Sequence, residues 1–280
     1  MVVVRFRKFS PMIRVIFTAV LTYLFFLTLL FVFQRKLQYF PMGKVQAVSA
    51  YGLTGFSEKI LTTKDEAKIL SWYRSARNNE KIILYFHGNA GNLGDRSHKF
   101  AAFAADGFGV LAITYRGYSG SEGKPSEAGL MMDADAAVQF LSDQGYLEKN
   151  IILFGESLGS GVAVQLAAKH NFGAIILESP FSSIAGVAQK TYWFVPVNLL
   201  LKDKFESIKF LPKISSPILI FHGTKDPIVP YAEGKKLFEA ATSPKKLITI
   251  EGAGHLNFGE EFLLQEMEKF LRGEYTKVIS

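Results

Sequence analysis

The sequence predicts an α/β fold with a mostly parallel sheet and helices on both of its faces. Two observations lead to this prediction. Short apolar runs recur along the chain, at residues 82–86, 109–114, 151–154, 174–177, 217–221 and 246–250. Runs this short and uninterrupted are typical of strands that are buried on both faces. Segments with helical spacing separate the runs, and such alternation is typical of parallel sheets.

The remaining elements complete this pattern. The segments with helical spacing are residues 93–105, 125–142, 158–169, 231–241 and 260–271. Residues 56–73 predict an antiparallel hairpin, with its turn around Asp65. Ligands of mostly parallel sheets bind at the carboxyl ends of the strands. The candidate functional residues are therefore expected directly after the strands.

The N-terminal segment is apolar enough to be a membrane anchor. Residues 15–33 carry no charge, and a helix of that length spans about 28 Å, close to the thickness of a hydrocarbon core. A buried core helix is one alternative, although few core helices are apolar on every face. A cleaved signal peptide is the other, but its apolar region is shorter and small residues follow it closely, whereas polar residues 34–36 follow here. We expect an anchor over 1–44, with a transmembrane helix at about 15–33, and one globular domain over 45–280.

The net charge of +7 is concentrated beside the apolar segment. Residues 1–44 contain no acidic residue, and their basic residues are Arg5, Arg7, Lys8, Arg14, Arg35, Lys36 and Lys44. The rest of the chain holds 25 basic and 25 acidic residues. Basic residues in this position meet lipid headgroups, and the body has no basic stripe interleaved with aromatics, so a membrane partner is expected and nucleic acid is not. Four basic residues precede the apolar segment and three follow it, an excess that favours a body outside the cytoplasm.

Residues 181–215 interrupt the alternation of strands and helices. They contain the aromatic residues Tyr192, Trp193 and Phe194 and the apolar run 199–201. Such a segment is too long and too apolar for a simple loop. We expect a small helical cap over the site. The alternative is a helical insert at the periphery that has no part in substrate binding.

A G-x-S-x-G motif follows the apolar run 151–154, as Gly155-Glu156-Ser157-Leu158-Gly159. In a strand-to-helix turn of this kind the serine is strained, and the residues two before and two after it must be small to let the backbones pass. The turn exposes the hydroxyl and directs the helix N-terminus towards it. The alternative is an ordinary glycine-rich helix start, but the position between a strand and a helix favours Ser157 as a nucleophile.

A serine hydroxyl needs a base to take its proton. In folds with this strand–turn–helix motif, the order along the chain is serine, acid, histidine. Three histidines follow Ser157. His170 ends a helix and His222 precedes the acid, whereas His255 follows the last strand in a flexible glycine-containing loop. His255 is therefore the candidate general base.

The acid is expected after the preceding strand, where Asp226 stands. It would accept the Nδ1–H of His255, fix the tautomer of the ring and stabilise the imidazolium. An aspartate before a proline is also common in turns, which is the alternative role of Asp226. Glu178, after an earlier strand, and Asp203, in the expected cap, are the reserve candidates.

Acyl transfer creates an alkoxide that needs N–H donors already in place, an oxyanion hole. One donor is expected to be the backbone N–H of Leu158, directly after the nucleophile, and the other should come from the loop after the 82–86 strand. The glycines of that loop let its backbone turn inward, so we assign the second donor to the N–H of Asn89, with Ala90 as the alternative. His87 in the same loop is expected to be structural.

Chemistry based on a metal or a cofactor is not expected. The chain has no cysteine, which excludes disulfides, a thiol nucleophile and cysteine-ligated zinc. No histidine or carboxylate spacing fits a catalytic metal. The loop glycines Gly88, Gly91 and Gly94 hint at a phosphate loop, but the G-x-x-x-x-G-K-[ST] pattern is missing.

Together these motifs resemble those of the membrane-anchored alpha/beta-hydrolase-domain serine hydrolases, within the alpha/beta-hydrolase superfamily. The matching pieces span about residues 60–270 and are residues 85–92, 115–118, 121–123, 125–127, 155–159 and 222–226, with His255. The resemblance implies the alpha/beta-hydrolase fold with an eight-stranded sheet, and hydrolysis of esters, thioesters or amides without a cofactor. The chain departs from the family at Ser119 and Ser160, where relatives often have glycine.

The expected activity is hydrolysis of an acyl ester or thioester, in a lipid-like or acyl-protein substrate, through a triad of Ser157, His255 and Asp226 and an acyl-enzyme. A peptidase or amidase of the same fold is one alternative. A transacylase, which hands the acyl group to an acceptor other than water, is another. A membrane-anchored binding protein without catalysis is the third, because a fold alone does not guarantee activity.

Overall fold

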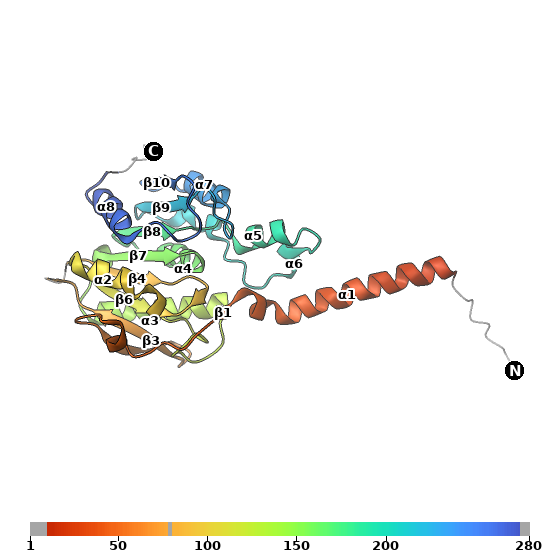
Figure 1. Cartoon of the computed structure of the whole chain (residues 1–280), viewed down its shortest axis with the longest axis horizontal. Coiled ribbons are helices and arrows are strands. Elements are labelled where there is room, and N and C mark those ends of the chain that lie inside the picture. Colours follow the sequence, from red (N-terminus) through yellow and green to blue (C-terminus); the bar gives the residue numbers. More distant parts are fainter. Residues whose placement is uncertain (1–9, 78–79, 275–280) are drawn as a thin grey trace.

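An eight-stranded sheet lies at the centre of the structure, a computed structural model that describes residues 10–77 and 80–274. The order of its strands is β10-β9-β8-β7-β4-β6-β3-β2 (Figure 1). The pairs β2–β3 and β3–β6 are antiparallel and the other neighbours are parallel. The strands are β2 Ser57–Thr62, β3 Lys68–Arg74, β4 Ile82–Phe86, β6 Gly109–Ile113, β7 Ile151–Glu156, β8 Ala174–Glu178, β9 Ile218–Gly223 and β10 Lys245–Ile250. The predicted mostly parallel sheet is confirmed.

Helices cover both faces of this sheet. Those of the body are α2 Ser97–Ala105, α3 Glu127–Asp143, α4 Leu158–Ala167, α7 Tyr231–Ala240 and α8 Glu260–Leu271. Core residues of α3, α4 and α7 pack together on one face, and those of α2 and α8 pack on the other. Within β4, Leu84 belongs to the first core and Tyr85 to the second, because successive side chains of a strand point to opposite faces. This double burial explains the uninterrupted apolar runs in the sequence.

Several helix boundaries differ from the predicted ones by a few residues. The segment predicted as one helix over 93–105 begins as a 3₁₀ turn, Leu93–Arg96, before α2. The Asn92 side chain caps this turn by accepting the N–H of Gly94 at 2.8 Å. The helix after the G-x-S-x-G motif ends at Ala167, two residues earlier than predicted.

The N-terminal helix α1 (Pro11–Gln38) projects from the body (Figure 1). It has 28 residues and a mean hydropathy of 2.5 over its most apolar stretch, none of which is buried, so it is long and apolar enough to cross a membrane. Pro11 opens the helix after Ser10, a combination that favours a helix start. Arg5, Arg7 and Lys8, on which the predicted orientation depends, lie outside the described residues.

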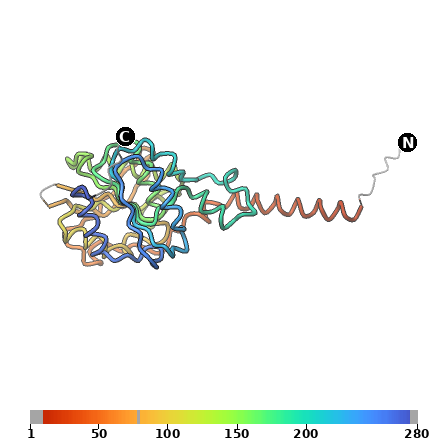
Figure 2. Tube along the Cα trace, turned by 90° about the horizontal axis from the view of Figure 1, so that it is seen from above, coloured from red at the N-terminus to blue at the C-terminus, as the bar shows by residue number. Residues whose placement is uncertain are grey.

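The segment expected to be a cap is helical and lies beside α1. It contains α5 (Ile184–Thr191) and α6 (Val197–Leu200), followed by the 3₁₀ turns Ser207–Lys209 and Leu211–Lys213. Both α5 and α6 extend beyond the body along the side of α1, which two perpendicular views show (Figures 1 and 2). At its other end α1 runs into β1 (Phe40–Pro41), which pairs in parallel with β5 (Ala90–Gly91). The loop after β4 is therefore tied to the end of α1.

Arg116 lies in the segment after β6 and joins it to α3 and to the β2–β3 turn. Its Nε lies 2.8 Å from the carboxylate of Asp133 in α3, and its terminal nitrogens lie 2.8 and 3.0 Å from the carboxylate of Asp65 in the β2–β3 turn. Asp133 is fully buried, and burial raises its pKa to about 6 although Arg116 opposes the shift. The hairpin and α3 are therefore held together by a buried cation.

We expect Arg116→Met to lower the free energy of unfolding by about 3–5 kcal/mol, because the Asp133 carboxylate would stay buried without its cation. Chemical denaturation in detergent, followed by circular dichroism, measures the loss. Lys169→Met is a matched control, since it removes an ion pair with Asp135 in which both side chains are nearly half exposed, and about 0–1 kcal/mol is expected. Equal losses in the two variants would contradict the structural role of Arg116.

Candidate active site

Ser157 occupies a strained turn between β7 and α4. Its φ and ψ angles are 50° and −111°, in a region that residues with a side chain rarely adopt. A Cβ atom at Gly155 would lie 2.6 Å from the Gly159 carbonyl oxygen, and one at Gly159 would lie 2.0 Å from the Phe86 carbonyl oxygen. The two glycines of the motif are therefore needed because strand and helix backbones pass in direct contact. Strain of this kind costs about 1–3 kcal/mol and is typical of functional sites.

The structure brings Ser157, His255 and Asp226 together in one hydrogen-bonded chain. His255 Nε2 lies 3.0 Å from Ser157 Oγ, and His255 Nδ1 lies 2.7 Å from Asp226 Oδ2. The three residues follow β7, β9 and β10, at the carboxyl ends of parallel strands in the same part of the sheet. Chain order and strand position, which the sequence analysis used, are thus enough to place them.

Asp226 is held in its ionised form. Burial alone would raise the pKa of its carboxyl, but hydrogen bonds with His222 and His255 and with the backbone N–H of Val229 lower that pKa far below its usual range. The side chain is fully buried, and its second oxygen accepts the N–H groups of Ile228 and Val229, each at 2.8 Å. A charged Asp226 accepts the Nδ1–H of His255, which leaves Nε2 unprotonated and facing Ser157.

Contacts with neighbouring segments hold the loop that carries His255 in place. The Ser179 hydroxyl donates a hydrogen bond to the His255 carbonyl oxygen. A Cβ atom at Gly223 would lie 2.3 Å from the Gly254 carbonyl oxygen, so the end of β9 and the histidine loop approach more closely than any side chain allows. Gly223 therefore lets the acid and the base reach the same edge of the sheet.

The other histidines in this half of the chain lie elsewhere. His222 is fully buried, and its Nε2 lies 2.9 Å from the Val229 carbonyl oxygen and 3.5 Å from the Asp226 carboxylate. It therefore packs against the acid and does not face the serine. His170 lies on the surface, 2.7 Å from Glu148. Neither is the histidine that contacts Ser157.

The reserve acids have other partners. Glu178 is fully buried and pairs with Lys99 at 2.5 Å, and Asp203 accepts two hydrogen bonds from Arg35, at 2.7 and 3.1 Å. Asp226, rather than Glu178 or Asp203, is the carboxylate that contacts His255.

A cluster of ionisable side chains, largely shielded from solvent, packs against the turn at Ser157. Glu156, the residue before the serine, pairs with Arg96 at 2.7 Å and with Lys99 at 3.6 Å, and it accepts a hydrogen bond from the Tyr85 hydroxyl. Burial would raise the pKa of Glu156, but Lys99 and Arg96 lower it below its usual range. Glu178 faces Lys99 in the same cluster, and burial raises the pKa of its carboxyl although Lys99 opposes the shift. No local pattern in the sequence predicts this cluster, because its charged members are separated by up to 82 positions.

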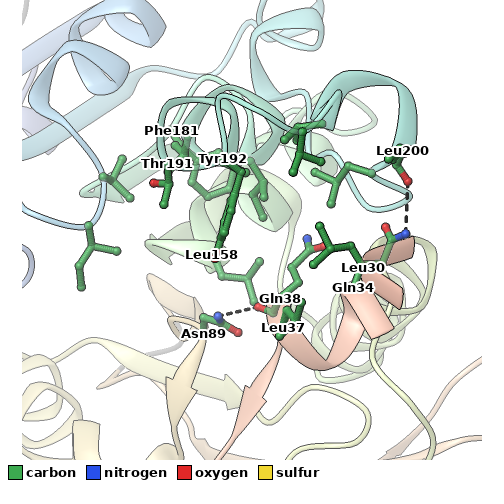
Figure 3. A pocket seen from close by; sticks show the side chains of 18 of the residues that line it. Leu30, Gln34, Leu37, Gln38, Asn89, Leu158, Phe181, Thr191, Tyr192 and Leu200 are labelled. Atoms are coloured by element: carbon green, nitrogen blue, oxygen red, sulfur yellow. Dashed lines mark hydrogen bonds between the residues drawn. The ribbon is translucent and has the colours of Figure 1, made fainter. Parts of the chain in front are cut away.

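Leu158 and Asn89, the expected oxyanion donors, line the same pocket as Ser157. Leu158 is the first residue of α4, and Asn89 lies in the loop after β4. The Asn89 side chain is fixed on both sides. It accepts from the Tyr118 hydroxyl at 2.8 Å and donates to the Gln38 carbonyl oxygen at 2.7 Å (Figure 3).

The pocket in front of Ser157 has a volume of about 450 Å³ and is mainly apolar. Two of its walls are the cap and the last turns of α1 (Figure 3). Ile228 and Val229, before α7, also line it. The α1 residues that line it are Leu30, Phe31, Gln34, Leu37 and Gln38. These residues were not predicted to line the site. The available signal was a pair of glutamines, Gln34 and Gln38, four residues apart at the end of an apolar helix. Among the described residues, no group of three or more histidines and carboxylates could hold a metal ion.

A strained serine at a strand-to-helix turn, aligned with a histidine and a carboxylate at the edge of a mostly parallel sheet, defines the class of alpha/beta hydrolases. The family model of the serine aminopeptidases S33 matches residues 77–209 and 206–261. The chain belongs to this family of alpha/beta-hydrolase-domain proteins, and it is a hydrolase by that membership.

Three known proteins illustrate the similarity. An uncharacterised protein of Mycobacterium tuberculosis H37Rv is 37% identical over 226 residues, which are 79% of this chain and 80% of that protein. The alpha/beta hydrolase domain-containing protein 17B of Homo sapiens is 35% identical over 226 residues, covering 78% of this chain and 75% of its own. The esterase Pf2001 of Pyrococcus furiosus has the same fold, with a TM-score of 0.66, 19% identity, and coverage of 85% of this chain and 98% of its own.

His87 is buried against Tyr115 and Tyr118, with its Nδ1 2.6 Å from the Gly88 carbonyl oxygen. Burial, aided by the charge of Arg96, lowers its pKa to about 4. The ring therefore stays neutral in the folded protein and holds the loop that carries Asn89.

This buried ring predicts a loss of stability in acid. An unfolded histidine has a pKa near 6.5, so between about pH 6.5 and 4 the unfolded chain binds more protons and the free energy of unfolding falls as the pH is lowered. We expect His87 to contribute up to about 3 kcal/mol to this fall. Denaturation curves at pH 7.5 and pH 4.5 should show a larger difference for the wild type than for His87→Gln. The same difference in both proteins would show that His87 protonates freely in the folded state.

Proposed function

We propose that the chain is a serine hydrolase of acyl esters or thioesters that acts through Ser157, His255 and Asp226. The observation that carries the proposal is the hydrogen-bonded chain of these three side chains, which ends at a serine lining an apolar pocket. The strained turn and the ionised Asp226 support the same function.

The reaction would proceed in two steps. Ser157 Oγ attacks the acyl carbonyl carbon while its proton passes to His255 Nε2, and the N–H groups of Leu158 and Asn89 stabilise the alkoxide. The imidazolium then gives its proton to the leaving oxygen or sulfur, and the acyl-enzyme forms. A water molecule, deprotonated by His255, attacks the acyl-enzyme and releases the acid and free Ser157.

The apolar pocket supports an acyl chain as the part of the substrate that is recognised, in a lipid-like molecule or an acylated protein. The family's description as serine aminopeptidases supports a second candidate, cleavage of an amide in the same pocket. A transacylase would use the same acyl-enzyme with another acceptor. The helix α1 supports a single-pass membrane anchor as the location of the enzyme.

A fluorophosphonate probe tests the nucleophile in the purified full-length protein in detergent. We expect the wild type to be labelled and Ser157→Ala to lose all labelling, since the probe reacts only with an activated serine. Ser243→Ala, which changes a buried serine of the body, is the matched control and should keep the labelling. A folded wild type that is not labelled would favour the non-catalytic binding protein. Hydrolysis of acyl esters, acyl thioesters and aminoacyl amides by wild-type protein that has not met the probe then separates esterase from peptidase, and analysis of the products identifies a transacylase.

The acid is tested by Asp226→Asn. We expect kcat to fall by about 10⁴, because an asparagine side chain can favour the wrong tautomer of His255. The reserve candidate is tested by Glu178→Gln, which should change kcat far less because Glu178 contacts Lys99. The specific activity of folded protein, checked by circular dichroism, is the measurement. A larger effect on kcat from Glu178→Gln than from Asp226→Asn would reverse the assignment of the acid.

A further inference from the structure

The helix α1 forms one wall of the pocket that contains Ser157. Leu30, Gln34 and Leu37 point from its last turns towards the cap and towards Leu158 (Figure 3). The opposite wall comes from the cap, including Tyr192. The groove that leads to the serine is therefore bounded by a helix that is apolar enough to cross a membrane.

Polar contacts fix the cap against α1 at the level of the pocket. Arg35 donates two hydrogen bonds to Asp203, at 2.7 and 3.1 Å. The Gln34 amide donates to the Leu200 carbonyl oxygen at 3.2 Å and accepts from the Lys202 N–H at 2.7 Å. Because both residues bind the cap, the width of the groove is set by the helix and the cap together.

The cap continues along α1 far beyond this level. The Tyr23 hydroxyl donates to the Phe194 carbonyl oxygen at 2.6 Å, and the rings of Phe26 and Phe194 stack with centroids 6.2 Å apart. Twelve residues separate Tyr23 from Arg35, which corresponds to about 18 Å along a helix axis. Half of a hydrocarbon core measures about 15 Å. If Arg35 lies at the membrane surface, the tip of the cap lies near the middle of the bilayer.

The tip of the cap has a composition and a hydrogen-bonding pattern suited to lipid. Residues 191–201 carry no charge, and Trp193 and Leu199 are 78% and 81% exposed. The side chain of Gln189 donates to the carbonyl oxygen of Val195 at 3.2 Å and accepts the N–H of Val197 at 3.2 Å. Backbone groups in a hydrocarbon phase need such internal partners, since no water is present.

Cations mark where the polar phase begins. Lys36 and Lys202 lie over the rings of Phe33 and Phe31, at 5.6 and 4.1 Å from the ring centroids. Arg35 lies at the same height along the axis of α1 as these two lysines. Arg14 lies 21 residues earlier, about 31 Å along the helix. This separation matches one hydrocarbon core, with the tip of the cap on the hydrocarbon side of Arg35.

We propose that residues 192–200 insert into the bilayer beside α1, and that the acyl chain of a membrane-resident ester or thioester enters the groove between α1 and the cap directly from the lipid. In this arrangement α1 is part of the substrate-binding site, and Leu30 helps to select the acyl chain. The second half of the proposal rests on the function proposed above, whereas the first half does not.

Native tryptophan fluorescence tests the insertion without reference to catalysis. The chain has two tryptophans, and Trp72 is fully buried in the body. We expect Trp193, observed in the Trp72→Phe variant of the full-length protein, to lose most of its fluorescence in phosphatidylcholine vesicles brominated near the middle of the acyl chains, and to resist aqueous iodide. Trp193→Phe, which retains Trp72, should respond to neither quencher. Quenching of Trp193 by iodide and not by brominated lipid would overturn the insertion.

A pair of adjacent leucines tests the acyl site. Leu30 lines the groove, whereas Leu29 belongs to the same turn and is 41% exposed outside it. We expect Leu30→Trp to lower kcat/KM for a long-chain acyl ester by about tenfold or more, since filling a specificity pocket has effects of this size. Hydrolysis of a short soluble ester should fall by a smaller factor than hydrolysis of the long-chain ester, and Leu29→Trp should change neither rate.

The outcomes separate the two proposals. Equal effects of Leu29→Trp and Leu30→Trp, or equal loss of short-chain and long-chain activity in Leu30→Trp, would overturn the acyl site in the groove. If wild-type protein in vesicles hydrolyses neither ester and takes no label, the proposed function fails and the acyl site fails with it. Quenching of Trp193 by brominated lipid would still support the inserted cap in that case.

Discussion

The candidate site depends on the close approach of three backbone segments around Ser157. The serine can hold its strained conformation only because α4 passes against the ends of β4 and β7, with glycine at positions 155 and 159. Such strain, of about 1–3 kcal/mol, persists only where the surroundings are rigid. The buried pairs of Glu156 with Arg96 and Lys99 supply part of this rigidity directly behind the turn. Breaking a buried pair by removing one partner is costly, so the network resists local rearrangement.

The parallel sheet brings the other two residues of the site to Ser157. Strands β7, β9 and β10 end at one edge of the sheet, so the residues that follow them meet although they are far apart in the sequence. The hydrogen bonds of Asp226 with Ile228 and Val229 then fix the carboxylate, and Asp226 fixes the ring of His255. The geometry therefore follows from strand order and turn structure, with few side chains left free to adjust.

Much of this could be predicted from the sequence, because the deciding signals are local. The apolar runs and their spacing predicted the sheet, and the G-x-S-x-G motif predicted the turn at Ser157. The position of α1 relative to the cap could not be predicted, since an apolar helix has the same periodicity whether lipid or protein faces it. Arg35 and Asp203 lie 168 residues apart, and no pattern in the chain links them. The buried cluster around Glu156 escaped prediction for the same reason.

The end of α1 also connects the apolar helix with the centre of the site. The Gln38 carbonyl oxygen accepts a hydrogen bond from the Asn89 side chain, and Asn89 belongs to the loop expected to supply an oxyanion donor. The residues that follow α1 form β1, and the pairing of β1 with β5 holds the same loop in place. A body separated from α1 would therefore lose one wall of the pocket and a support of the Asn89 loop together. In this structure the apolar helix is more than a tether, because the groove in front of Ser157 is complete only when α1 and the cap are both in place.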